Sequence, residues 1–186
     1  MRKWVALVLV LVLLLSACGQ KTGDVLENPD ITCDQISWSL AEEEIDENTY
    51  VVCSFTNNSS YTITSLRMSF TGKEDLTEAE ADEFYLAVQN SQNFSDSFME
   101  DFRSGRAEKG LSISMYAQAD ERLAPQQVAN SVKCYYCGGF TSKDMPYSGL
   151  FVPEILQITY EKNGRNYSID YEFASGGYTV AEVQGD

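Results

Sequence analysis

The chain has 186 residues, of which 28 are acidic, 13 are basic and none is histidine, so its formal net charge is −15. A strongly negative surface repels nucleic acid and anionic lipid headgroups, which excludes a nucleic-acid-binding function. The absence of histidine excludes serine and cysteine triads that use an imidazole base, and also metal sites with histidine ligands.

Residues 1–17 have the parts of a lipoprotein signal peptide. A basic start precedes an uncharged run from Trp4 to Leu15, which is shorter than the roughly 20 residues that a bilayer span needs. Leu15-Ser16-Ala17-Cys18 resembles the bacterial lipobox. The resemblance implies cleavage before Cys18, acylation of that residue, and anchoring at the extracytoplasmic face of the cell membrane. The alternative is an ordinary secretory signal peptide with a chance cysteine.

Residues 18–30 are short and polar and predict a tether, residues 31–180 one folded domain, and residues 181–186 a tail. Apolar and polar residues alternate along this domain, as is typical of strands with one buried face. The expected strands cover residues 36–40, 50–56, 66–70, 111–117, 128–136, 156–160 and 167–173, with an acidic turn at 42–48.

Asn163-Gly164 separates the last two alternating runs and predicts a hairpin with a type I′ turn, because that turn needs positive φ at both central residues. About seven short strands joined by turns favour a mainly β fold, an antiparallel Ig-like β-sandwich. In the fifth strand, Val128, Val132, Cys134 and Tyr136 have the same parity and are expected on one face.

Residues 76–104 break the alternation and predict a helical hairpin inserted between two strands. Thr77 and Glu80 have the spacing of a capping box, and polar residues 90–93 suggest a break between two helices. We expect Gly105 to end the second helix.

Several of these segments together resemble the small Ig-like domains of Firmicutes surface lipoproteins. The residues that carry the resemblance are Trp38-Ser39-Leu40, Thr49 to Val52, Thr56 to Ser59, Ile63 to Leu66, Val132 to Tyr136, Leu150 to Glu154 and Ile158 to Gly164. Such domains often have Pro-Gly before the fifth strand, where this chain has Pro125-Gln126. The resemblance implies a fold and a cellular location but no activity.

Four cysteines follow Cys18, namely Cys33, Cys53, Cys134 and Cys137. Cys53 and Cys134 lie on the apolar faces of expected strands, so a disulfide between them is possible in an exported protein, and buried free thiols are the alternative. Cys134 and Cys137 have C-x-x-C spacing, which also allows a redox pair or half of a zinc site. The expected strand before the motif and the absence of a second C-x-x-C disfavour both.

The acidic segment 42–47 could ligate calcium, although it matches no calcium-loop spacing, and a solvated acidic hairpin is the simpler interpretation. Seven tyrosines lie in the last third of the chain. Tyrosine is common both in strands and at recognition surfaces, so core packing and an exposed patch that includes Tyr147 both remain open.

No catalytic motif, cofactor motif or metal motif is recognisable. We therefore expect a membrane-attached, non-catalytic binding module for a protein or an envelope polymer. A structural envelope spacer without a ligand, and an accessory to a secreted enzyme, are the alternatives.

Overall fold

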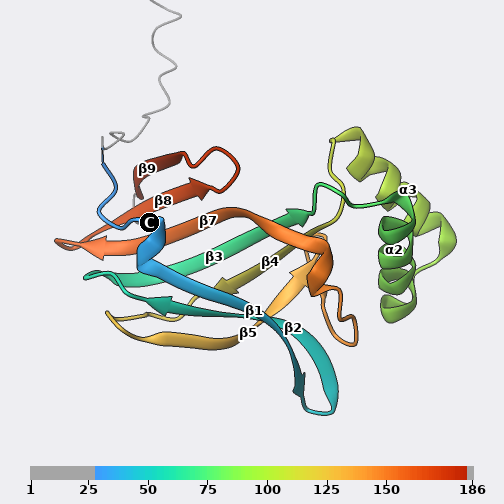
Figure 1. Ribbon diagram of the computed structural model, residues 1–186, viewed down its shortest axis with the longest axis horizontal. Helices are drawn as coiled ribbons and strands as arrows, with labels where there is room; N and C mark the ends of the chain where they lie inside the picture. Colours follow the sequence, from blue (N-terminus) through green and yellow to red (C-terminus); the bar gives the residue numbers. More distant parts are fainter. Residues whose placement is uncertain (1–27, 184–186) are drawn as a thin grey trace, which may run out of the picture.

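The computed structural model describes residues 28–183, and Figure 1 shows a long antiparallel sheet with a helical hairpin at one end. The signal peptide, Cys18 and most of the expected tether lie outside the described residues. The strands are β1 (Ile36–Ile45), β2 (Asn48–Asn57), β3 (Thr62–Gly72), β4 (Ser114–Ala119), β5 (Val128–Tyr136), β6 (Phe140–Thr141), β7 (Phe151–Lys162), β8 (Arg165–Glu172) and β9 (Tyr178–Val183). The helices are α2 (Glu78–Gln92) and α3 (Asp96–Glu108), with short 3₁₀ turns η1 (Cys33–Gln35) and η2 (Ser148–Leu150).

The nine strands form one sheet in the order β1-β2-β5-β4-β3-β7-β8-β9, with β6 paired to β5. The mainly β, antiparallel character expected from the alternation is confirmed. The Ig-like sandwich of two separate sheets is not confirmed, because the strands make a single open sheet. Strand β5 joins the strands into one sheet, because its first part pairs with β2 and its last three residues pair with β4.

The sheet is rolled so that β1 faces β3 across the core. Trp38 of β1 lies with its ring centroid 5.8 Å from that of Phe70 in β3, although three strands separate β1 from β3 in the sheet. Phe173, just after β8, lies 6.4 Å from the same indole ring. The inner face is lined by the apolar residues that alternate along each strand, including Phe55, Leu66, Met68, Cys134, Tyr136, Leu156, Ile158, Tyr160 and Ile169.

A bulge in β5 overturns one expectation about this face. Val128 is exposed and Ala129 is buried, whereas Cys134 and Tyr136 are buried as expected. Ser131 has a φ of +51°, and its amide donates to Ser54 Oγ at 3.1 Å. The extra residue reverses the parity of the strand, and simple alternation cannot reveal a bulge.

Two tight hairpins have positive φ at both central residues. Asn163 and Gly164 have φ of +53° and +73°, which confirms the predicted type I′ turn between β7 and β8. Asp46 and Glu47 have φ of +51° and +64°. The expected acidic turn over 42–48 was too long, because β1 continues through the glutamates and only this pair makes the turn.

The helical hairpin lies between β3 and β4, as predicted, and its break is at Asn93, which has left-handed backbone (φ +55°). Thr77 Oγ1 accepts from the Glu80 amide at 3.2 Å, and Glu80 Oε2 accepts from the Thr77 amide at 2.8 Å. The predicted capping box is therefore confirmed. The prediction that Gly105 ends the second helix was wrong, because α3 continues to Glu108.

Several further features differ from the sequence expectations or extend them. Strand β4 begins at Ser114 rather than Leu111, and β6 and β9 were not expected. The expected tail from residue 181 begins inside β9. At Pro125-Gln126 the chain makes a turn with Gln126 at a φ of +67°, and the Gln127 amide donates to the Ala124 carbonyl at 3.0 Å. Glutamine thus occupies a position that favours glycine.

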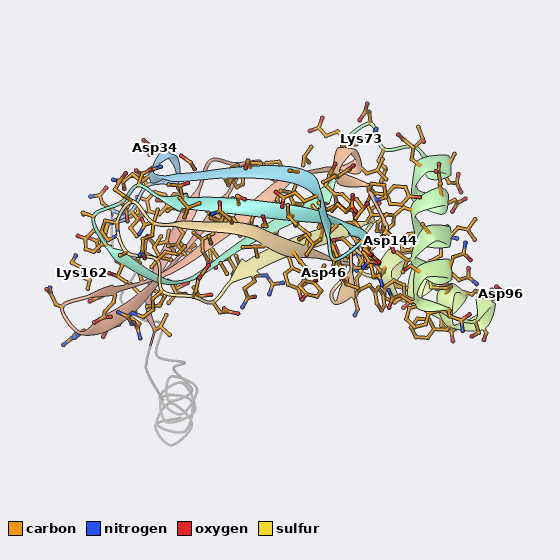
Figure 2. The ribbon with its side chains drawn as sticks, turned by 90° about the horizontal axis from the view of Figure 1, so that it is seen from below. Asp34, Asp46, Lys73, Asp96, Asp144 and Lys162 are labelled. Atoms are coloured by element: carbon orange, nitrogen blue, oxygen red, sulfur yellow. The ribbon has the colours of Figure 1, made fainter. Side chains whose placement is uncertain are left out.

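The segment before β1 is attached to the β7–β8 hairpin. Asp30 accepts hydrogen bonds from Lys162 Nζ at 2.7 and 2.8 Å and from Tyr160 Oη at 2.7 Å. Figure 2 shows Lys162 at one end of the molecule and Asp96, where α3 begins, at the other. The chain therefore enters the folded domain at the end opposite the helices.

Candidate ligand-binding surface

The predicted site residues do not form a reactive centre. All four cysteines within residues 28–183 are free thiols in the structure, with Cys53, Cys134 and Cys137 buried and Cys33 partly exposed. Burial raises the pKa of Cys53 to about 12 and also raises the pKa of Cys134 and Cys137. Such thiols are protonated at neutral pH and are poor nucleophiles. The Cys53–Cys134 disulfide stays a prediction, and Cys18 lies outside the described residues.

The acidic residues of the first hairpin are spread along a strand and a turn. Glu42 accepts from the Ser148 hydroxyl and Glu43 from the Ser131 hydroxyl, each at 2.6 Å. Within residues 28–183, no group of three or more acidic, cysteine or histidine side chains is placed to hold a metal ion. The same part of the chain contains no helix long and apolar enough to cross a membrane.

The seven tyrosines of the last third divide between the interior and the surface. Tyr136, Tyr160 and Tyr171 are buried, which confirms core packing for them. Tyr147 is half-buried, with its ring 5.7 Å from the ring of Phe84 in α2, so it does not belong to an exposed patch. Tyr135 is 38% exposed and lies on the outer face of the sheet.

A polar groove of about 210 Å³ lies on that outer face. It is defined by side chains from four neighbouring strands, namely Ser65 and Arg67 of β3, Gln118 of β4, Gln157 and Thr159 of β7, and Ser168 of β8. The lining residues are every second residue along β3 and β7. In β3, for example, Leu66 and Met68 point to the core and leave Ser65 and Arg67 on the outer face.

The strand register arranges these side chains in two rows. Gln118, Arg67 and Gln157 are direct cross-strand partners, and Asp170 of β8 continues this first row. Ser65, Thr159 and Ser168 form the second row. Cross-strand partners project from the same face about 5 Å apart, so the groove has a regular lattice of hydrogen-bonding groups.

Arg67 is at the centre of the groove. Its guanidinium carbon lies 4.1 Å from the centroid of the Tyr116 ring, and Tyr116 stacks on Tyr135 at 5.5 Å. Within the described residues its one hydrogen bond is a long one, from Nη1 to Gln118 Oε1 at 3.4 Å, and Nε is buried without a partner. A guanidinium has five N–H donors, so most of the donors of Arg67 have no acceptor among the described residues.

Two carboxylates flank the groove and orient its amides. Asp120 Oδ1 accepts from Gln118 Nε2 at 2.8 Å and from Ser65 Oγ at 3.0 Å. Asp170 Oδ1 accepts from Gln157 Nε2 at 3.3 Å. These bonds fix both amide groups, so that the surface presents a set pattern of donors and acceptors. One cation between two anions leaves the region slightly negative.

The surface of residues 28–183 also has two hollows outside the polar groove. One, of about 280 Å³, lies next to the polar groove beyond Asp170 and is lined by Ile155, Asp170, Glu172, Gly177, Tyr178 and Thr179. The other, of about 340 Å³, lies between α2 and α3. Arg103 is the basic residue that lines this second hollow, and it already forms an ion pair with Asp82.

The sequence alone does not reveal the polar groove. Its residues are the polar half of the alternation in β3, β7 and β8, and serine, threonine and glutamine at those positions are ordinary for a solvated face. The one unusual signal is Arg67, a charged residue in the middle of a strand. Its partners come from strands that are distant in sequence, and only the register brings them together.

No protein-family model, no curated protein and no solved structure matches the chain.

Proposed function

We propose that the protein is a lipid-anchored, non-catalytic binding module at the extracytoplasmic face of a bacterial cell membrane, and that the polar groove is its binding surface. The lipobox-like segment ending at Cys18 supports the anchor and the location. The groove supports binding, because its side chains belong to rigid strands and are held in fixed positions.

The buried Nε of Arg67, which has no partner among the described residues, carries this proposal. A buried donor without a partner has an unfavourable free energy of roughly 1–3 kcal/mol, and native proteins rarely keep one without a reason. A ligand oxygen that draws the guanidinium slightly outward would satisfy it. The hydrogen bond donated by Arg67 Nε would then form only in the complex.

A binding function without catalysis agrees with the chemistry of the described residues. The buried thiols have a raised pKa, and the chain contains no histidine that could serve as a base. The arrangement of the molecule also suits an anchored module. The tether enters at Asp30, so the sheet and the helices extend away from the attachment point (Figure 1).

We also propose that the rolled sheet is a variant of the Ig-like arrangement of Firmicutes surface lipoproteins. Its support is the packing of β1 over β3, with Trp38 between the two layers. An experimental structure in which β1 and β3 do not face each other would contradict this relationship.

Two measurements test the function, the first on the full chain and the second on the chain without its lipid anchor. Expressed in a bacterium, the protein is expected to partition into the detergent phase of a Triton X-114 extraction, whereas Cys18→Ser is expected to remain in the aqueous phase. The chain from Gly19 onward, which lacks the lipid, is expected to co-sediment saturably with isolated cell envelopes. Linear, non-saturable co-sedimentation would favour a structural spacer instead.

A further inference from the structure

We infer that the polar groove recognises an uncharged saccharide chain, an inference that rests on the proposed binding function. The ligand class follows from the kinds of side chain present, from their charges, and from the aromatic surface at one end of the groove.

The groove offers the mixture of donors and acceptors that sugar hydroxyls require. Each hydroxyl donates one hydrogen bond and accepts two. Gln118 and Gln157 supply amides, the serines and threonine supply hydroxyls, Arg67 supplies donors, and Asp120 and Asp170 supply strong acceptors at the two sides. No apolar side chain lines the groove.

The charges favour an uncharged ligand over an anionic one. Arg67 is the one basic residue of the groove, and carboxylates lie on both sides of it. The whole chain has a net charge of −15, so a polyanionic glycan would be repelled during approach. An uncharged polyol has no such cost, and its hydroxyls can contact both Arg67 and the carboxylates.

Tyr116 and Tyr135 add a stacked aromatic pair where the groove meets β4 and β5. Tyr135 is 38% exposed, and its ring offers a flat surface for the C–H face of a sugar ring. From β5 to β8 the sheet is roughly 19 Å wide at about 4.8 Å per strand. The surface therefore has room for an oligosaccharide rather than for a single sugar.

A protein partner fits these features less well. The centre of a protein–protein interface is usually apolar and poor in charge, with aromatic anchors. Here the centre is occupied by Arg67, amides and hydroxyls, and Tyr135 lies at the margin. A protein ligand remains an outcome that the following experiment can detect.

The test uses the purified full-length chain in a detergent without a sugar headgroup. Isothermal titration is performed with uncharged hexasaccharides of glucose, xylose, mannose and N-acetylglucosamine, and with hexagalacturonate as the anionic comparison. We expect at least one uncharged hexasaccharide to bind and hexagalacturonate not to bind. Arg67→Ala and Gln157→Ala should each weaken that binding at least tenfold.

Arg122→Ala is the matched control, because Arg122 is an exposed arginine paired with Glu161 and does not line the groove. Its affinity should equal that of the unmodified chain, and circular dichroism should show that all variants are folded. Binding of hexagalacturonate alone, or of none of the sugars, overturns the saccharide proposal. If envelope binding still depends on Arg67, the binding function survives and the ligand is of another class, such as a protein. If envelope binding is also absent, both proposals fail.

Discussion

At Asn57 a single buried amide holds the turn after β2 in place. Its Nδ2 donates to the carbonyls of Tyr61 and Leu123 at 2.8 and 2.9 Å. Its Oδ1 accepts from the amide and the hydroxyl of Ser59 at 3.0 and 2.7 Å. All the capacity of the side-chain amide is therefore used inside the protein, and this turn is tied to the segment before β5.

We expect Asn57→Ala to lower the free energy of unfolding by about 3 kcal/mol, because it leaves several buried polar groups without partners. Asn58→Ala is the matched control. Asn58 is exposed, and its Nδ2 makes one bond, at 2.8 Å, to the Ser37 hydroxyl. Its loss should be about 0.5 kcal/mol. Urea unfolding of both variants measures the difference, and equal losses would contradict the role of the buried amide.

The pH dependence at Asp30 tests the attachment of the N-terminal segment. Burial alone would raise the pKa of this carboxyl group, but hydrogen bonds from Lys162, Tyr160 and Tyr61 and the charge of Lys162 outweigh that effect, so the pKa lies below its usual value of 3.8. A carboxylate with a depressed pKa stabilises the fold above its pKa in the unfolded chain. This stabilisation is lost as the pH falls through the lower pKa of the folded state.

Asp30→Asn should accordingly lower the melting temperature at pH 7, and the gap to the unmodified protein should narrow as the pH falls below about 3.8. Thermal unfolding followed by circular dichroism between pH 7 and pH 3 measures the gap. Lys162→Met should give a similar gap, and the double variant should add little to either single change. A gap independent of pH would exclude the ion pair as its cause.

At the scale of the element, α2 packs on the sheet through Phe84, with Tyr85 and Val88 buried beside it. Phe84 is fully buried, and its ring lies 5.0 Å from Tyr136 in β5 and 5.7 Å from both Tyr147 and Phe151. We expect Phe84→Ala to cost about 3–5 kcal/mol of unfolding free energy. Leu86→Ala, at a position of the same helix that is 56% exposed, should change it by less than about 0.5 kcal/mol. A small loss in both variants would mean that the helices are not anchored there.

Two glycines make a matched pair for backbone conformation. Gly105 lies inside α3 with open space around it, so Gly105→Ala should stabilise the protein by about 0.5–1 kcal/mol. Gly164 has a φ of +73° in the β7–β8 turn, so Gly164→Ala should destabilise it by about 1 kcal/mol. Chemical denaturation of both variants measures the change in unfolding free energy, which should be positive for Gly105→Ala and negative for Gly164→Ala. Two changes of the same sign would contradict the turn assignment or the helix assignment.

Elements with a local cause were predictable from the sequence. The capping box at Thr77, the Asn163–Gly164 turn and the inward face of β3 are all determined by residues close together in the chain. The predicted end of α3 was too early because the sequence does not distinguish a glycine inside a helix, such as Gly105, from one that ends a helix. The bulge at Ser131 gave no local signal, and it reversed the expected faces of Val128 and Ala129.

For the whole molecule, the rolled single sheet depends on pairings between distant segments. That β5 joins β2 to β4 is a property of the register, and no pattern within β5 predicts it. The polar groove depends on the same pairings, because Arg67 meets Gln118 and Gln157 only in the assembled sheet. Except at the β5 bulge, sequence patterns therefore predicted which strand residues face outward, but not which of them meet.

The most direct test of the proposed binding surface is envelope co-sedimentation of the chain from Gly19 onward in three forms, namely unmodified, Arg67→Ala and Arg122→Ala. The unmodified and Arg122→Ala chains should bind saturably with equal affinity, and Arg67→Ala should bind at least tenfold more weakly. Equal binding by all three forms would show that the polar groove is not the binding surface.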